Sequence, residues 1–334
     1  MKHSGILIID KPASFTSHDV VAKLRAALRI KRVGHGGTLD PMATGVLPVF
    51  IGRATRAAQF CENAEKEYIA GLRLGIVTDT QDITGTALSD SPHTAGICDV
   101  RAVLPLFLGE QKQLPPMYSA IKIGGKKLYE LARRGVEIER EARDITISKI
   151  ELIEPSKSAL CREEGGDFPG GDIFLRIVCS KGTYIRTLCH DIGAKLGCGG
   201  AMSYLRRTRV GAYSADAAHT LKDALSSILS GSAGDILCPV DSMFSRYPSI
   251  ILSEADAQKV KNGARPRIKS TEQGRVASGV REESICEAPG VREEPCAREL
   301  PVGRYKVYAP NGEFLLIGEL KNGELITIKS FFEV

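Results

Sequence analysis

Residues 34–48 read GHGGTLDPMATGVLP, and this stretch is the most informative part of the chain. Its four glycines and two prolines predict a loop instead of a helix or a strand. Asp40 precedes Pro41, so the Asp40 backbone is pushed toward an extended conformation. A lone Asp-Pro is most often a turn whose aspartate accepts hydrogen bonds from nearby amides. This loop also holds His35, however, and functional side chains concentrate on loops that a rigid scaffold supports.

The segments on either side of this loop alternate between strand and helix patterns. Gly5–Ile9 is an apolar strand, and Ser17 is placed to cap a helix with apolar residues at helical spacing. Residues 66–74 alternate, with Tyr68 on the apolar face, which predicts a half-buried strand. Further strands are expected at Val46–Ile51, Ile145–Leu152 and Ile173–Cys179, and further helices at Lys126–Arg134 and Tyr184–Leu196. This mixture predicts an α/β (α+β) fold.

The composition excludes several classes of protein. Hydrophobic residues make up 43% of the 334 residues and charged residues 25%, which is ordinary for a globular protein. The 45 Lys and Arg against 40 Asp and Glu give a net charge of +5, which permits an anionic partner without requiring one. Because no apolar run suits a membrane span or a signal peptide, we expect a cytoplasmic protein without membrane contact. Nine cysteines without a Cys-x-x-Cys pair argue against a disulfide framework and a zinc site.

The composition changes after about residue 243. Short β segments follow, with the hairpin signals Asn311-Gly312 and Asn322-Gly323. Residues 270–300 are charged, contain GVREE twice and lack aromatic residues, so we expect a disordered insertion there. The predicted organisation is a mixed α/β domain over residues 1–243 and a small β-rich domain over residues 244–334.

The loop at 34–48 closely resembles the catalytic motif of the TruB family of tRNA pseudouridine synthases, with Asp40 at the position of the family's catalytic aspartate. The resemblance covers most of residues 5–214 in order. Four further blocks carry it: residues 5–17 (GILIIDKPASFTS), 65–85 (EKEYIAGLRLGIVTDTQDITG), 113–135 (QLPPMYSAIKIGGKKLYELARRG) and 179–209 (CSKGTYIRTLCHDIGAKLGCGGAMSYLRRTR).

The resemblance implies a pseudouridine synthase fold with a mixed, largely antiparallel central sheet, followed by a PUA-like RNA-binding domain. It implies an isomerase that converts uridine 55 in the T-loop of tRNA into pseudouridine. The reaction breaks the N1–C1′ bond and rejoins the ring through C5, so we expect no cofactor and no metal. The expected partner is the T-stem–loop of tRNA, bound by a monomer that needs no guide RNA.

Three residues are expected to be catalytic by the same resemblance. Asp40 would act as nucleophile or base, with Arg186 as its ion-pair partner. Tyr68 would stack on the target base, which must leave its own stack to be reached. From the residues alone, the surface of a helix would be favoured for Arg186, and the core side of a strand would be the commoner position for Tyr68.

Four further residues are expected to bind the substrate. Leu205 matches a pocket-lining leucine of the family, and Lys181 and Tyr184 would lie close to the pocket. His35 would be exposed in its loop and contact RNA. The basic clusters are expected to form a surface that tracks phosphates, and they lie at residues 29–32, 126–127, 133–134 and 206–209.

Expectations also concern Gly36, Lys11 and Asp82. The family usually has Thr where Gly36 stands, and the missing hydroxyl is expected to affect efficiency instead of the chemistry. Lys11 would stabilise the fold. Asp82 would contact RNA, contact its neighbours or be solvated.

Other functions fit parts of the same pattern. A related RNA-guided subunit would need a ribonucleoprotein, and activity on a bare tRNA arm would distinguish it. An RNA-binding protein without activity would retain the fold, but Asp40, Tyr68 and Arg186 are all present. A hydrolase that used Asp40 would need a Ser/His/Asp arrangement, a second placed carboxylate or a metal site, none of which the sequence indicates.

Overall fold

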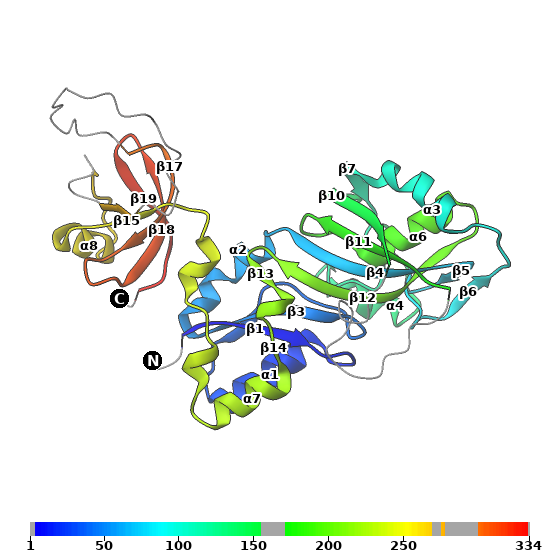
Figure 1. Cartoon of the computed structure of the whole chain (residues 1–334), viewed down its shortest axis with the longest axis horizontal. Helices are drawn as coiled ribbons and strands as arrows, with labels where there is room; N and C mark the ends of the chain where they lie inside the picture. Colours follow the sequence, from blue (N-terminus) through cyan, green and yellow to red (C-terminus); the bar gives the residue numbers. More distant parts are fainter. Residues whose placement is uncertain (1–3, 155–170, 269–274, 278–299, 333–334) are drawn as a thin grey trace. The chain divides into compact units, whose positions relative to one another are not determined.

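The computed structural model describes residues 4–154, 171–268, 275–277 and 300–332 (Figure 1). Contacts divide the chain into two units. The larger unit consists of Leu7–Val49 and Ala58–Ile236, and the smaller of Met1–Ile6, Phe50–Ala57 and Leu237–Val334. Two short N-terminal segments thus belong with the C-terminal part of the chain, which no sequence pattern indicated. The domain boundary expected at residue 243 stays a prediction.

A ten-stranded sheet forms the centre of the larger unit. Its strands are β1 (Gly5–Lys11), β2 (Val33–His35), β3 (Thr44–Ile51), β4 (Lys66–Leu74), β7 (Gly109–Gln113), β10 (Arg143–Ile153), β11 (Ile173–Cys179), β12 (Gly200–Val210), β13 (Tyr213–Ser214) and β14 (His219–Thr220). The main path runs β14-β1-β3-β12-β4-β11-β10-β7. Two pairs, β1–β14 and β3–β12, are parallel, whereas β12–β4, β4–β11, β11–β10 and β10–β7 are antiparallel. The expected mixed, largely antiparallel sheet is confirmed.

Strand β4 lies between β12 and β11 and is covered more completely than the half-buried strand that the alternation predicts. Tyr68, Ala70 and Leu72 belong to the main hydrophobic core on one face. On the other face, Ile69 is 2% exposed and packs with Phe174 of β11. The alternation identified the core face correctly, and the central position of the strand adds burial on the second face.

Helices and short hairpins complete the larger unit. The helices are α1 (Ser17–Leu28), α2 (Ala58–Glu62), α3 (Ile97–Val103), α4 (Leu128–Ala132), α6 (Ile185–Lys195) and α7 (Leu221–Leu229), with 3₁₀ turns at Leu104–Phe107, Ala215–Ala217 and Ala233–Ile236. The hairpins are β5–β6 (Ile76–Thr78, Ala87–Asp90) and β8–β9 (Lys122–Ile123, Lys126–Lys127). The expected helix at 126–134 therefore begins later, because its first two residues form β9.

The start of α1 differs from the prediction in an informative way. Thr16, instead of Ser17, is the N-cap: its hydroxyl accepts a hydrogen bond from the Asp19 amide, and the Asp19 carboxylate accepts one from the Thr16 amide. This is a capping box. Ser17 is free for another partner, and its hydroxyl oxygen accepts a hydrogen bond from the Leu39 amide at 2.9 Å.

The C-terminal part of the smaller unit contains a five-stranded sheet in the order β16-β15-β17-β18-β19. Its elements are β15 (Ser249–Ile251), α8 (Glu254–Lys261), β16 (Arg275–Ala277), β17 (Gly303–Tyr308), β18 (Phe314–Lys321) and β19 (Glu324–Ser330), and 3₁₀ turns lie at Gly52–Ala57 and Val240–Phe244. Antiparallel pairing of β17 with β18 and of β18 with β19 confirms both predicted hairpins. Helix α8, capped by Ser253, was not expected. Of the insertion predicted at 270–300, only 275–277 and residue 300 lie within the described residues.

Two expectations from composition can be compared with the described residues. Against a disulfide framework, Cys61, Cys98, Cys179, Cys189, Cys198 and Cys238 are free; of these, Cys61, Cys179 and Cys189 are buried and Cys98 is exposed. In the described part of the chain, we find no helix with both the length and the apolar character needed to cross a membrane.

Candidate functional site

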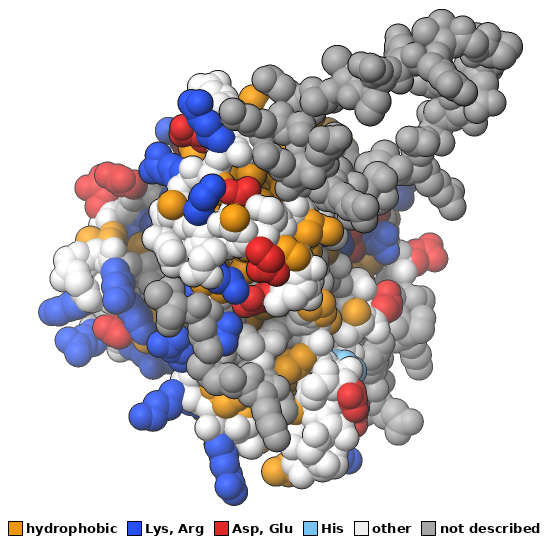
Figure 2. Space-filling view, turned by 90° about the vertical axis from the view of Figure 1, so that its left-hand side faces the viewer, with side chains coloured by type: hydrophobic (Ala, Val, Ile, Leu, Met, Phe, Trp, Pro, Cys, Tyr) orange, Lys and Arg blue, Asp and Glu red, His pale blue; other side chains and the backbone are white. Residues whose placement is uncertain are grey.

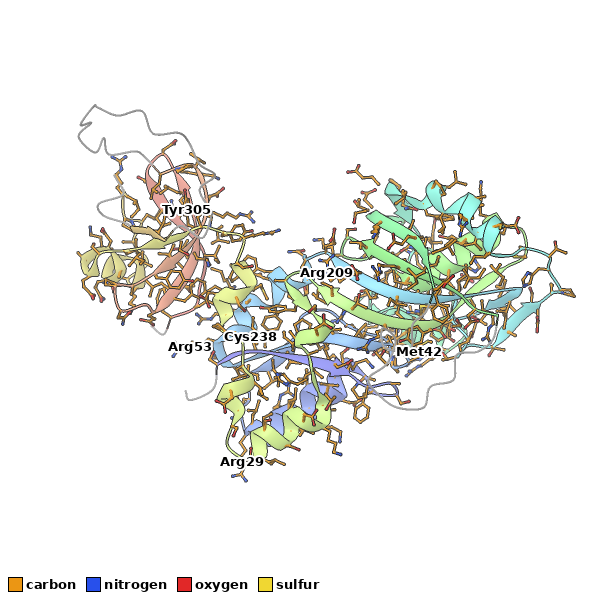
Figure 3. All side chains as sticks on the ribbon, in the orientation of Figure 1. Arg29, Met42, Arg53, Arg209, Cys238 and Tyr305 are labelled. Carbon is orange, nitrogen blue, oxygen red and sulfur yellow. The ribbon has the colours of Figure 1, made fainter. Side chains whose placement is uncertain are left out.

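The loop within residues 34–48 is shorter than the glycines and prolines of this stretch predict. Its beginning belongs to β2 and its end to β3, so the motif loop proper is residues 36–43. Met42, labelled in Figure 3, marks this loop. Gly45 permits the close pairing of β3 with β12: its φ is +102°, and a Cβ there would lie 2.2 Å from the Arg207 carbonyl oxygen.

Lys11 holds the peptide that follows Asp40. Its side chain is fully buried, and its ammonium group donates to the carbonyl oxygens of Pro12 (2.8 Å), Phe15 (2.7 Å) and Pro41 (3.3 Å). Desolvation lowers the pKa of Lys11 to about 8, while the nearby Asp40 carboxylate opposes that change. Lys11 was expected to stabilise the fold, and it does so at the motif loop, through its hydrogen bond to the Pro41 carbonyl oxygen.

Asp40 and Arg186 form an ion pair, as the motif match predicted. The Arg186 Nε lies 2.9 Å from Asp40 Oδ2, and Nη2 donates to Oδ1 at 3.5 Å. Arg186 sits in the first turn of α6 and is buried, which excludes the surface position that its sequence alone allowed. Its remaining donors bind the carbonyl oxygens of Thr80 (3.1 Å) and Tyr118 (3.0 Å). The guanidinium group is thus held from several segments.

Asp82 is the second carboxylate near Arg186. It is 5% exposed, and its Oδ2 lies 3.7 Å from the Arg186 Nη1. Its Oδ1 accepts hydrogen bonds from the hydroxyls of Thr80 and Thr84 and from the Thr84 amide. Of the three possibilities that the sequence left open, the structure shows contact with neighbours. Asp82 orients the loop between β5 and β6 against Arg186.

The Asp40 side chain is partly exposed, and its partial burial still changes the pKa of its carboxyl group. Its side chain is 35% exposed, compared with 6% for Arg186. Burial raises the pKa of the Asp40 carboxyl above its usual value, and the Asp82 charge adds to the rise. The positive charges of Arg186 and Lys11 oppose it. Such competition between desolvation and a fixed cation is typical of reactive carboxylates.

Tyr68 and Leu205 lie on the same face of the central sheet. Tyr68 is 9% exposed on β4, Leu205 is 6% exposed on β12, and both belong to the core cluster that includes Leu39 of the motif loop. Burial raises the pKa of the Tyr68 phenol, while the charge and hydrogen bond of Arg207 oppose that rise. The structure therefore brings Tyr68 and Leu205 to the motif loop, and their roles stay predictions.

Lys181 and Tyr184 lie in the turn before α6. Tyr184 is half-buried, and its backbone N–H and C=O are both bonded to the side chain of Gln113, at 2.8 and 3.0 Å. Lys181 is exposed and donates to Asn63 Oδ1 at 2.7 Å. In the free protein, the Lys181 ammonium group is thus bonded to Asn63.

His35 is not the exposed loop residue that we expected. It ends strand β2, is half-buried, and forms an edge-to-face contact with His18 at 5.3 Å between ring centroids. Burial, with the charges of His18 and Arg207, lowers the pKa of His35 to about 4. The imidazole is therefore neutral at physiological pH.

Gly36, the departure from the usual motif, is held through its backbone. Its amide donates to the Pro48 carbonyl oxygen at 3.0 Å, and its carbonyl oxygen accepts from the Cys61 thiol at 3.5 Å. This region of the loop is therefore anchored without a side chain at position 36.

The expectation of a phosphate-tracking surface is wrong for two of its arginines. Arg206 and Arg207 are 5% and 1% exposed. Arg206 forms an ion pair with Asp10, and Arg207 donates to backbone carbonyl oxygens of the motif segment. Because successive residues of a strand point to opposite faces, two adjacent arginines in β12 cannot share one surface. Arg209, labelled in Figure 3 near the end of β12, is partly exposed and pairs with Glu65 at 2.9 Å.

Some of these contacts had no signal in the sequence. The carbonyl oxygens of Thr80 and Tyr118 are held toward Arg186 by loop conformation, which residue types do not specify. Among the described residues, no group of three His, Cys, Asp or Glu side chains could hold a metal ion.

Two family models match consecutive parts of the chain. Residues 25–185 match the N-terminal domain of the TruB family pseudouridylate synthases, and residues 186–245 match the C-terminal domain of tRNA pseudouridylate synthase B. The chain belongs to the TruB family. Asp40 and Tyr68 lie in the first matched region, and Arg186 and Leu205 lie in the second. As a TruB-family pseudouridine synthase, the protein is an isomerase.

Curated TruB relatives cover most of the chain. The tRNA pseudouridine synthase B of Alkaliphilus oremlandii (strain OhILAs) is 48% identical over 264 residues, which cover 78% of this chain and 82% of the relative. That of Bacillus subtilis (strain 168) is 42% identical over 263 residues, with 78% and 82% covered. Among solved structures, a chain of a Cbf5-Nop10-Gar1 complex has a TM-score of 0.67 at 25% identity, covering 98% of this chain and 85% of that chain.

Proposed function

We propose that this protein isomerises uridine 55 in the T-loop of tRNA to pseudouridine, with Asp40 as the catalytic carboxylate. One observation carries the proposal. In a member of the TruB family, the Asp40 carboxylate is partly exposed and lies 2.9 Å from a buried guanidinium group that the carbonyl oxygens of Thr80 and Tyr118 hold in place. A carboxylate oriented in this way can serve as nucleophile or base without moving its cation.

The proposed reaction needs only groups of this kind. The N1–C1′ bond of the uridine breaks, a C5–C1′ bond forms, the C5 proton leaves to solvent and N1 gains a proton. Asp40 either attacks a carbon of the substrate or accepts a proton from it. Arg186 keeps the carboxylate oriented and limits the rise of its pKa. No oxidant, reductant or phosphate donor enters this balance, which supports the expectation that no cofactor is used.

The target uridine would have to be flipped out to reach Asp40. The chemistry occurs at a glycosidic bond inside the RNA loop, so binding to the enzyme must offset the free-energy cost of unstacking the base. Tyr68 offers an aromatic face and Leu205 an apolar wall on the same face of the sheet as the motif loop. His35, neutral and next to the loop, would contact the RNA, and Tyr184 and Lys181 would bind near the base.

Basic side chains supply an electrostatic surface for RNA. Arg29, Lys31, Arg32, Lys126, Arg133 and Arg134 are exposed in the larger unit. Lys and Arg also gather along one edge of the face seen in Figure 2. RNA loops are recognised by shape and by splayed bases, with phosphate contacts adding salt-dependent affinity. The small β-rich domain would add RNA contacts of the PUA-like kind.

The curated relatives carry the name tRNA pseudouridine synthase B, which favours tRNA as the substrate. The solved relative, in contrast, comes from a complex with two named partners. We propose that this chain works alone, as a monomer and without a guide RNA. Activity on a bare RNA hairpin distinguishes a stand-alone enzyme from one that needs a guide RNA or partner proteins.

The deciding experiment is tritium release from [5-³H]uridine in an unmodified T-arm hairpin, with purified protein and no guide RNA. The Asp40→Asn variant is assayed beside the wild type, and RNA binding is measured for both. Release by the wild type alone is expected, with equal binding by both proteins. Release by both would overturn the assignment of Asp40. Tight binding without release by the wild type would contradict the stand-alone activity or the choice of uridine.

A further inference from the structure

Arg207 is one of the largest fully buried side chains of the protein, and the reaction as proposed gives it no role. It is 1% exposed in strand β12. Its backbone is in register with Tyr68 of β4 on one side and with Gly45 of β3 on the other. Residues directly opposite each other in an antiparallel pair point to the same face. Arg207 therefore lies on the face that carries Tyr68.

The guanidinium group of Arg207 binds both ends of the motif segment. Its Nε donates to the Val46 carbonyl oxygen at 2.7 Å, Nη2 to that of Gly37 at 3.2 Å, and Nη1 to that of Thr38 at 3.4 Å. All three acceptors belong to residues 37–46, which enclose Asp40. One side chain thus closes the loop across its base.

The geometry points to Arg207 as a positioning residue for pseudouridylation, which holds the Asp40 loop at a fixed place relative to Tyr68. This inference rests on the proposed function. Asp40 is in a loop and Tyr68 is in a strand, so their separation depends on what ties the loop to the sheet. Arg207 makes that connection, because its backbone pairs with Tyr68 and its side chain binds the loop.

Arginine suits this position better than lysine. Its planar fork presents donors in fixed directions, so it can bind three separate carbonyl oxygens, whereas an ammonium group is a single point. Arginine also stays charged when buried, while a buried lysine loses its proton more readily. The Arg207 charge opposes the rise in the pKa of Tyr68 that burial causes.

The test compares Arg207→Lys with the matched variant Arg176→Lys. Arg176 lies in strand β11, on the far side of β4 from β12, and its side chain is 41% exposed beside Glu151. Single-turnover rate at saturating RNA, RNA affinity, melting temperature and hydrogen exchange of the peptide covering residues 34–48 are measured for each. The amides of Gly36, Leu39 and Ala43 are hydrogen-bonded in the wild type and report loop order.

We expect Arg207→Lys to bind the T-arm hairpin with wild-type affinity but to react about 100-fold more slowly, since small misplacements of reacting groups cost about that much. Exchange of the three loop amides should be at least about 10-fold faster, because the loop opens locally. Arg176→Lys should match the wild type in every measurement.

Three results would overturn the inference: unchanged exchange in Arg207→Lys, an unchanged rate, or a loss confined to RNA affinity. If Arg207→Lys does not fold, Arg207→Gln, which keeps an amide donor, is measured in the same way and judged by the same results. A wild type that released no tritium would refute the proposed function instead, while the exchange data would still decide whether Arg207 holds the loop.

Discussion

Two of the Asp–Arg ion pairs in the larger unit are built from the same groups and differ in almost everything else. Asp10 of β1 and Arg206 of β12 meet in two short contacts of 2.7 and 2.9 Å, and their side chains are 10% and 6% exposed. Asp40 and Arg186 share one contact of 2.9 Å and one of 3.5 Å, and Asp40 is 35% exposed.

The difference shows how one interaction can serve stability or chemistry. In the first pair, two strands of the sheet hold both partners, and the Asp10 side chain is only 10% exposed, so its carboxylate is closed to a substrate. In the second pair, carbonyl oxygens hold the arginine while the carboxylate sits in a loop and remains partly open. A fixed cation beside an accessible carboxylate is an arrangement suited to catalysis.

The largest expected effect is a loss of turnover on substitution of Asp40, with no such loss on substitution of Asp10. Asp40→Asn should reduce the single-turnover rate by at least about 1,000-fold, because an amide is neither a nucleophile nor a base. RNA binding should persist. Asp10→Asn should retain wild-type turnover per folded molecule. Tritium release from a T-arm hairpin measures both, and comparable losses in the two variants would erase the distinction.

The arginines provide the second comparison. Arg186→Lys should slow turnover by about 100-fold, because lysine cannot hold Asp40 and two carbonyl oxygens in one plane. The expected change is in the rate at saturating RNA, with little change in affinity. A single-turnover titration with RNA separates the two quantities, and a purely affinity-based loss would move Arg186 to the RNA-binding residues.

The free energy of unfolding should be affected more by Asp10→Asn than by Asp40→Asn, which is the reverse of their expected order for turnover. Asp10→Asn removes a charge from a buried, doubly bonded pair, and we expect unfolding to become easier by about 2 kcal/mol. That corresponds to a melting temperature lower by roughly 5 °C. Asp40→Asn should shift it far less, since its carboxylate is partly exposed. Calorimetry of the three proteins decides this, and equal melting temperatures would contradict the structural role of Asp10.

The smallest expected effect is in the pH dependence. The proposed reaction would use the ionised form of Asp40, and burial raises the pKa of that carboxyl above its usual value near 3.8. The rate should therefore fall as the pH drops through the raised pKa, so the midpoint of the acid limb of the single-turnover profile lies above the usual pKa of an aspartate. The Asp10→Asn variant should show the same limb. A limb below the usual value, or one that moves in Asp10→Asn, would contradict this assignment.

Sequence patterns predicted much of the fold, and they erred where tertiary contacts reassigned a polar group. Alternation located β4, and the Asn-Gly signals located both C-terminal hairpins. Ser17 was expected to cap α1, but Thr16 caps it because the Ser17 hydroxyl binds Leu39 of the motif loop. Residue preferences at the N-cap consider only the residues next to the helix. They therefore miss a distant group, such as the Leu39 amide, that bonds to one of the candidate caps.

The sequence by itself was enough to identify the family and to select Asp40, Tyr68 and Arg186 as candidate site residues. These inferences depend only on residue type and on the order of the motifs along the chain. Only the tertiary structure decided which arginines are buried and what they hold. Arg206 and Arg207 are adjacent in sequence, yet one binds Asp10 and the other binds the Asp40 loop. Their separation follows from strand geometry and from neighbours far away in the chain, since a side chain's environment depends on what packs against its face.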